Sequence, residues 1–262
     1  MGWSVFRRKP RVTTAPGPGL REQLPDATRE ELATIRSVRS YTMTSPERIL
    51  ALIRAVRHVV EHRIPGDFVE CGVWRGGSVL AMLRTLQELG ATDRLVWMYD
   101  TFEGMSPPTT RDVDFRGNQA DQLLADQERD DPSSIWCYSG LEEVRRVLAS
   151  SDYPADLLRF VPGPVESTLH SNRLPDSIAL LRLDTDWYES TMVELQVLFP
   201  RLEDRGVLII DDYGHWQGCR RAVDEYFAEQ RVGMYLHRID YTGRIGIHRR
   251  STLANGTIVT KP

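Results

Sequence analysis

The chain has 262 residues, of which 41% are hydrophobic and 27% are charged, and its net charge at pH 7 is −4. These values fit one large soluble globular domain, and they give no general electrostatic preference for nucleic acid or anionic membranes. No apolar run approaches the length that crosses a bilayer, and the start of the chain lacks the apolar core of a signal peptide. Three cysteines without metal-type spacing fit a reducing compartment, so we expect a cytoplasmic protein.

The N-terminal part divides into two segments. Residues 1–25 are rich in Pro, Gly and Thr and are expected to form a mobile tail, or one that folds over a neighbouring subunit. Residues 26–64 are expected to form a helical extension. Within it, Ser45-Pro46-Glu47 has the order of an N-cap, a first-turn proline and a first-turn acid, and apolar residues at helical spacing follow.

From residue 65 to 250, short apolar runs alternate with longer amphipathic runs, which predicts an α/β domain with a mostly parallel sheet covered by helices on both faces. A hairpin near the end of this domain should add antiparallel pairing at one edge. Residues 251–262 would form a C-terminal tail. The expected strands are 68–69, 95–99, 157–161, 178–183, 207–210, 234–238 and 244–248, and the expected helices are 78–89, 191–199 and 219–229.

The segment 101–139 interrupts this alternation. It contains Pro107-Pro108, many Asp and Arg residues, and a pattern that predicts a short helix over 120–128. A long irregular connection over the carboxyl edge of a sheet is typical of an active-site lid. The alternative is a surface excursion that has no function.

Two acidic clusters follow two expected strands. Asp184 and Asp186 come directly after strand 178–183, and Asp211 and Asp212 follow strand 207–210. Ligands of open α/β sheets bind outside the carboxyl ends of the strands, and buried carboxylates are costly unless they are paired. Several acids at that edge indicate a hard divalent cation, because Mg²⁺ and Ca²⁺ prefer oxygen ligands.

A glycine-rich stretch, Glu70 to Ser78, joins the first strand of the domain to its first helix. It is not the dinucleotide fingerprint, because Trp74 occupies the second glycine position, and it lacks the Lys of a phosphate-binding loop. Glu70 would repel a pyrophosphate and suits a ligand that carries an amine. The alternative is an ordinary glycine-rich turn.

Asp100 closes the second strand, where an acid commonly binds the ribose hydroxyls of a nucleoside. Together with Glu70 and the glycines, it indicates a ligand with a positive charge, a ribose and no phosphate. S-adenosylmethionine has these properties.

Several motifs together resemble the macrocin O-methyltransferase (TylF) family over about residues 40 to 230. The resemblance implies a Rossmann-like class I methyltransferase fold with a seven-stranded sheet. It also implies S-adenosylmethionine- and Mg²⁺-dependent methylation of sugar hydroxyls in natural-product biosynthesis, including antibiotic pathways. The segments that carry it are GDFVECGVWRGGS (66–78), TMTSPER (42–48), FEG (102–104), LDTDWYEST (183–191), DDYG (211–214) and GCRRAVD (218–224).

The same resemblance implies roles for individual residues. It implies a metal held by Asp184, Asp211 and Asp212, a general base at Asp186, and an acceptor pocket that depends on the 101–139 insertion. We also expect a homo-oligomer without nucleic-acid or membrane partners. The implied cofactor residues are Glu70, Gly72, Val73, Trp74, Ser78, Asp100 and Thr101.

Other readings of the residues stay open at this point. His215, near the second acidic cluster, is a rival base, or a loop histidine that faces solvent or substrate. The acceptor could be phenolic or catecholic instead of a sugar. A metal-dependent hydrolase or phosphotransferase would need a phosphate cradle, an oxidoreductase would need the missing glycine pattern, and a non-enzymatic binding protein would not need both acidic clusters.

Overall fold

The computed structural model describes residues 19–250, except for 130, 132–133 and 171–173. Its centre is a seven-stranded sheet in the order β3-β2-β1-β4-β5-β7-β6. The first five strands along this order are parallel, and β7 runs antiparallel to both of its neighbours. The strands are β1 (Asp67–Cys71), β2 (Val96–Asp100), β3 (Leu158–Pro162), β4 (Ile178–Leu183), β5 (Leu202–Ile210), β6 (His237–Arg238) and β7 (Arg244–Ile247).

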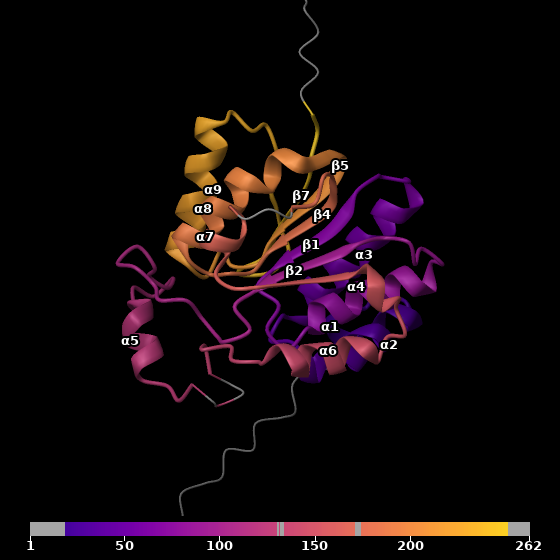
Figure 1. The fold of residues 1–262 in the computed structure, drawn as a ribbon, viewed down its shortest axis with the longest axis horizontal. Coiled ribbons are helices and arrows are strands. Elements are labelled where there is room, and N and C mark those ends of the chain that lie inside the picture. The colour runs from indigo at the N-terminus through magenta and orange to yellow at the C-terminus, as the bar shows by residue number, and fades with distance from the viewer. Residues whose placement is uncertain (1–18, 130, 132–133, 171–173, 251–262) are drawn as a thin grey trace, which may run out of the picture.

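Helices cover both faces of the sheet (Figure 1), each over its own apolar cluster. One face packs α2 (Arg29–Val38), α3 (Pro46–Glu61), α4 (Gly77–Glu88) and α6 (Leu141–Ala149). The other packs α7 (Val165–Thr168), α8 (Tyr188–Val197) and α9 (Gln217–Glu229). The predicted α/β fold with a parallel sheet and an antiparallel edge hairpin is therefore confirmed. Smaller elements are α1 (Leu20–Gln23), α5 (Ala120–Ala125), and the 3₁₀ turns η1 (Arg39–Tyr41), η2 (Ala155–Leu157) and η3 (Phe199–Arg201).

The strand register brings the ends of the central strands into one line. Cys71 pairs with Leu183 across β1 and β4, and Leu183 pairs with Ile210 across β4 and β5. The pairing continues past the strands, since the Asp184 amide donates to Cys71 at 2.9 Å and the Asp211 amide donates to Leu183 at 2.9 Å. The two acidic clusters therefore begin at the same level of the sheet.

The N-terminal extension is longer than predicted. Helix α1 and the buried Leu24 fall within residues 1–25, where a tail was expected, because their apolar side chains reach the cluster under α2 and α3. Helix α3 begins as predicted, with the Ser45 side chain accepting from the Arg48 amide. The expectations for residues 1–18 and 251–262 lie outside the described residues. No helix in the part that is described is long and apolar enough to span a membrane.

Hydrogen bonds join the described part of the insertion 101–139 to the start of α8. The Asp112 carboxylate accepts from the Tyr188 amide at 2.8 Å, and the Trp187 indole donates to the Ser106 carbonyl at 2.9 Å. Its helix, α5, ends three residues earlier than predicted, at Ala125. Helix α6, which follows the insertion, was not predicted.

Candidate active site

One cavity lies at the carboxyl edge of the sheet, and both sequence-predicted regions contribute to its wall. Gly72, Trp74 and Asp100 line it on the side of β1 and β2, whereas the two acidic clusters line it on the side of β4 and β5. The insertion supplies part of the wall through residues such as Met105 and Cys137.

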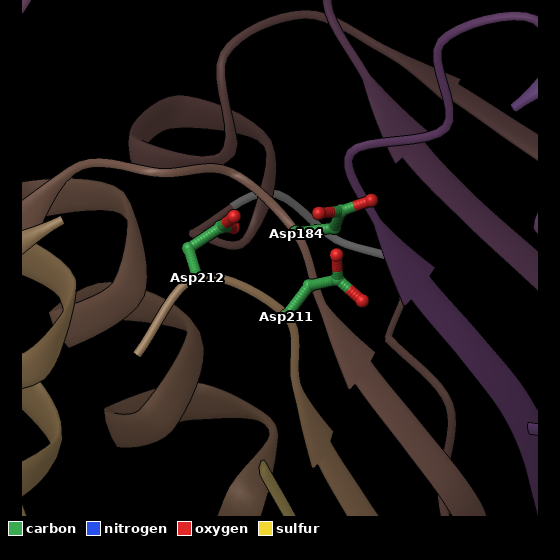
Figure 2. Close-up of side chains that lie close together, drawn as sticks. All are labelled: Asp184, Asp211 and Asp212. Atoms are coloured by element: carbon green, nitrogen blue, oxygen red, sulfur yellow. The ribbon is translucent and has the colours of Figure 1, made fainter. Parts of the chain in front are cut away.

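The three acids predicted as metal ligands lie together. Asp184, Asp211 and Asp212 each offer a carboxylate oxygen, and these oxygens lie within 4.8 Å of one another. Figure 2 shows the three side chains converging from the loops that follow β4 and β5. Asp211 and Asp212 are buried, while the side chain of Asp184 is 26% exposed and faces the cavity. This donor set suits a hard cation.

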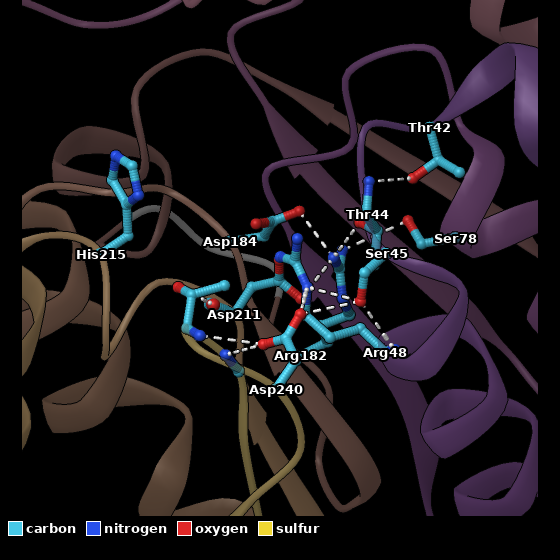
Figure 3. A network of polar contacts seen from close by, with 12 residues as sticks. Thr42, Thr44, Ser45, Arg48, Ser78, Arg182, Asp184, Asp211, His215 and Asp240 are labelled. Carbon is cyan, nitrogen blue, oxygen red and sulfur yellow. Dashed lines mark hydrogen bonds and ion pairs between the residues drawn. The ribbon is translucent and has the colours of Figure 1, made fainter. Parts of the chain in front are cut away.

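A buried arginine holds two of these acids in place (Figure 3). Arg182 on β4 pairs at 2.8 Å with both Asp184 and Asp211, and at 2.7 Å with Glu70 on β1. It also donates to the Thr44 hydroxyl at 3.0 Å. Burial opposes its charge, but the carboxylates around it outweigh burial and raise its pKa.

A second arginine reaches the cluster from the N-terminal extension. Arg48 on α3 donates to Asp211 and, at 3.0 Å, to Asp240 in the turn between β6 and β7. The extension is therefore part of the site and not only a cover for the sheet.

Asp186 and Asp212 face each other without a guanidinium between them. Burial, the largest cause, and the neighbouring Asp184 raise the pKa of Asp186 to about 7. Burial and Asp186 together hold the pKa of Asp212 well above its usual range. The Trp216 side chain hydrogen-bonds Asp186, whereas Oδ2 of Asp212 is buried without a hydrogen-bond partner among the described residues. Asp186 also has a positive φ of 66°, which turns the chain out of β4.

The glycine-rich loop owes its glycines partly to the chain's own packing. A Cβ on Gly72, where φ is 82°, would stand 1.9 Å from the Asp184 carbonyl oxygen. A Cβ on Gly77 would stand 2.5 Å from the Tyr41 carbonyl oxygen. These two positions need glycine because neighbouring segments approach too closely for a side chain.

Asp100 lies where it was predicted and lines the cavity, but backbone donors already occupy much of its carboxylate. Oδ2 accepts from the amides of Val73 at 2.6 Å and Trp74 at 2.9 Å, and Oδ1 accepts from Phe102 at 2.6 Å. Burial raises its pKa against these hydrogen bonds. The next residue, Thr101, also lines the cavity, and its hydroxyl donates to the Gly104 carbonyl.

Glu70 was expected to bind a ligand amine, but in the structure it lies inside the protein. It is fully buried, bonds to Ser78 and Arg182, and is not among the residues that line the cavity. Burial raises its pKa to about 7 in spite of the arginine. A direct contact between Glu70 and a cofactor amine therefore has no support in this arrangement, because the carboxylate is turned toward the inner network. Ser78 does reach the cavity wall.

His215 lines the cavity within a group of aromatic side chains. Its Nδ1 lies 3.1 Å from the Tyr241 hydroxyl, and its ring centre lies 4.9 Å from that of Trp216. Burial lowers its pKa, which favours the neutral ring.

Sequence reasoning missed Arg182, Arg48 and Trp216 as parts of the site. Arg182 had a usable signal, since a charged residue inside the apolar run of β4 must have a buried partner. Arg48 lay within the family motif 42–48 but had no assigned role, and Trp216 had no signal, because only the fold brings α3 and the start of α9 to the ends of β4 and β5.

The profile of the family described as macrocin-O-methyltransferase (TylF) matches residues 12–247. This chain belongs to that family. It is 36% identical over 204 residues to the demethyldecarbamoylnovobiocin O-methyltransferase of Streptomyces niveus, covering 78% of this chain and 74% of that protein. It is 32% identical over 204 residues to the mycinamicin III 3''-O-methyltransferase of Micromonospora griseorubida, covering 78% and 77%.

Solved structures agree with this assignment. The O-methyltransferase NovP is 35% identical and matches with a TM-score of 0.68 over 80% of this chain and 83% of that one. The chain is therefore an O-methyltransferase with the class I fold, and the sequence-based assignment to this family and enzyme class, which uses S-adenosylmethionine, is confirmed.

Proposed function

We propose that this enzyme transfers a methyl group from S-adenosylmethionine to a hydroxyl of a sugar in a glycosylated natural product, with Mg²⁺ as a second cofactor. The observation that supports it most is that one cavity wall joins the glycine-rich loop and Asp100 to the carboxylate cluster. Two ligands held in one cavity gain the proximity that a bimolecular transfer needs. The related enzymes are named for methylation of natural products, among them a rhamnosyl-bearing tetracenomycin.

The charges at the cluster fit a divalent cation. Six carboxylates gather there, and Arg48 and Arg182 form ion pairs with four of them. Asp186 and Asp212 have no ion pair in the described structure, and one Asp212 oxygen lacks any hydrogen bond. Asp184, Asp211 and Asp212 would hold the cation. When bound, it stabilises negative charge on an acceptor oxygen.

Asp186 is the proposed general base. Its carboxylate lines the cavity, and the hydrogen bond from Trp216 fixes its direction. Without a cation, burial raises the pKa of Asp186 to about 7, and a cation held beside it would lower this pKa, so the carboxylate would be ionised and able to accept a proton at neutral pH. His215 is the weaker candidate, since its Nδ1 is already engaged with Tyr241.

The cofactor is proposed to lie along the loop from Gly72 to Trp74, with its ribose at Asp100. Oδ2 of Asp100 accepts two amides at 2.6 and 2.9 Å, whereas Oδ1 accepts the Phe102 amide at 2.6 Å and has only a long contact, 3.5 Å, with the Thr101 hydroxyl, so Oδ1 is the oxygen proposed to accept a ribose hydroxyl. The same carboxylate would therefore hold the loop and the ribose.

The direct test is mass spectrometry of methyl transfer to a panel of glycosides and matched phenols, with Mg²⁺ or with EDTA. We expect methylated glycoside only with the metal. Transfer to phenols alone would contradict the sugar assignment, and full activity in EDTA would contradict the metal.

A variant separates the base from the ligands. Asp186→Asn should slow methyl transfer by about 10²- to 10⁴-fold, the usual share of a general base. Its affinities for Mg²⁺ and S-adenosylmethionine, measured by calorimetry, should stay close to those of the wild type. Near-normal turnover, or a defect confined to metal affinity, would move the base assignment to His215.

A further inference from the structure

We propose that Phe115, His215 and Tyr241 form an aromatic platform at the mouth of the cavity. An apolar ring of the acceptor's aglycone, attached to the sugar that is methylated, would pack on it. This inference rests on the proposed function, and it assigns the acceptor to glycosides that carry such an aglycone rather than to free or nucleotide-linked sugars.

The three rings contact one another although they come from three separate segments. The ring centre of Phe115 lies 5.3 Å from that of His215 and 6.0 Å from that of Tyr241. His215 and Tyr241 line the cavity. Phe115 is 50% exposed and Tyr241 is 52% exposed, so the cluster presents apolar ring surface to solvent beside the cavity. Contiguous exposed apolar surface at a cavity is typical of a ligand site.

Two tight turns hold the exposed rings in fixed positions. The Asp114 carboxylate accepts from the amides of Arg116 and Asn118, each at 2.8 Å, and so closes the turn that presents Phe115. The Asp240 carboxylate accepts from the amides of Thr242 at 2.9 Å and Gly243 at 2.7 Å, and so closes the turn that presents Tyr241. A platform that is ordered before binding costs little entropy when a ligand arrives.

Both turns are also tied to the reacting end of the site. The first turn pairs with Trp216 through a β-bridge at Asp114, and Trp216 hydrogen-bonds the proposed base Asp186. The second turn donates the Thr242 hydroxyl to the Asp211 carbonyl at 2.8 Å. The platform therefore has a fixed position relative to the carboxylates, as a subsite next to a reacting sugar requires.

The chemistry of the surroundings favours an apolar ring over a nucleotide. The six carboxylates of the cluster outnumber its two guanidinium groups and the two charges of the proposed Mg²⁺ taken together, which disfavours the diphosphate of a nucleotide-linked sugar. Aromatic rings instead pack well against flat apolar surfaces. Arg116 lies 5.1 Å from the ring centre of Phe115, so this ring also has a cation beside it.

The test compares one accepted sugar in three forms: its 4-nitrophenyl glycoside, its methyl glycoside and its nucleoside diphosphate derivative. Wild-type enzyme should show the lowest KM for the aryl glycoside. Phe115→Ala should raise that KM about 10-fold, equivalent to the loss of one ring contact, and leave the KM of the methyl glycoside unchanged. Tyr241→Ala should act in the same direction, and Tyr235→Ala is the matched control because this tyrosine is 81% exposed outside the cavity wall.

Each outcome decides between the inferences. Similar KM values for aryl and methyl glycosides in the wild type would overturn the platform and leave the proposed function standing, as would a Phe115→Ala defect shared equally by both acceptors. A lower KM for the nucleotide-linked form would also overturn it. Absence of methyl transfer to every glycoside of the panel, with transfer to phenols, would overturn the proposed function itself.

Discussion

Asp100 and Asp212 are acids at the carboxyl edge of the same parallel sheet, on β2 and after β5, with β1 and β4 between them, yet their surroundings are opposite. Three backbone amides donate to the carboxylate of Asp100. Asp212 faces another carboxylate, Asp186, and one of its oxygens has no donor within the described chain. The first environment stabilises a negative charge, whereas the second destabilises it unless a cation is added.

The difference separates the two halves of the cavity. On the side proposed for the cofactor, backbone amides satisfy Asp100, and this acid fixes the loop that follows β1. On the side proposed for the acceptor, acids lie together, and neither Arg48 nor Arg182 forms an ion pair with Asp186 or Asp212. Glu70 and Glu194 also have a buried oxygen without a partner, so the observation that favours a cation at Asp212 is that its unpartnered oxygen lies in a cluster with Asp184 and Asp211.

The largest loss of activity should follow substitution of Asp212, which has one carboxylate oxygen without a hydrogen-bond donor in the described chain. Asp212→Asn is expected to abolish measurable turnover and to weaken Mg²⁺ binding roughly 100-fold or more, since even outer-shell partners contribute about 10- to 100-fold. Calorimetric affinity for S-adenosylmethionine should change by no more than a few-fold. Asp224→Asn, in an exposed pair on α9, is the control. Unchanged Mg²⁺ affinity in Asp212→Asn would remove this residue from the metal site.

The next effect concerns the arginine that joins the two halves. Arg182→Met leaves Glu70 buried without an ion-pair partner and leaves Asp211 with Arg48 alone, so we expect a loss of about 3–5 kcal/mol in the free energy of unfolding. Arg221→Met removes an i,i+4 pair with Glu225 at a side chain that is 61% exposed and should cost less than about 1 kcal/mol. Urea denaturation measures both, and equal losses would show that the Arg182 network does not stabilise the fold.

The sequence predicted the features of the cavity that depend on local patterns, and it did not predict those that depend on contacts between distant segments. Strand β4 and the start of α3 were predictable because apolar runs and caps are local properties. The convergence of Asp184 with Asp211 and Asp212 was also predictable, because parallel strands end at one edge. The partners of Glu70 were not, because the choice between a ligand amine and Arg182 depends on which face of β1 and β4 the side chains share. Helix α6 was not predicted, because it directly follows the irregular insertion 101–139.

Glu70 should make stability depend on pH in a defined direction. Burial raises its pKa from 4.5 to about 7, so between these values the folded chain keeps a proton that the unfolded chain has lost. Stability should therefore fall as pH rises through this window, by up to about 3 kcal/mol from this residue. Urea denaturation in EDTA from pH 4.5 to 7.5 measures the slope, and Glu70→Gln should make it shallower by this share, while Asp186, whose pKa burial also raises to about 7, still contributes. An identical slope in the variant would show that Glu70 is ionised throughout.

The smallest expected effect tests whether Asp100 serves the cofactor as well as the loop. Asp100→Ala should weaken S-adenosylmethionine binding by about 1.5–3 kcal/mol, the range for hydrogen bonds to charged groups. Asp67→Ala is the matched control, because Asp67 also sits in a partly buried site and accepts from the Trp97 indole at 2.8 Å, but at the opposite end of β1. Both variants should lose stability, since each leaves donors unpaired, but only Asp100→Ala should lose cofactor affinity. Equal calorimetric affinities in the two variants would confine Asp100 to holding the loop and would place the ribose elsewhere on the cavity wall.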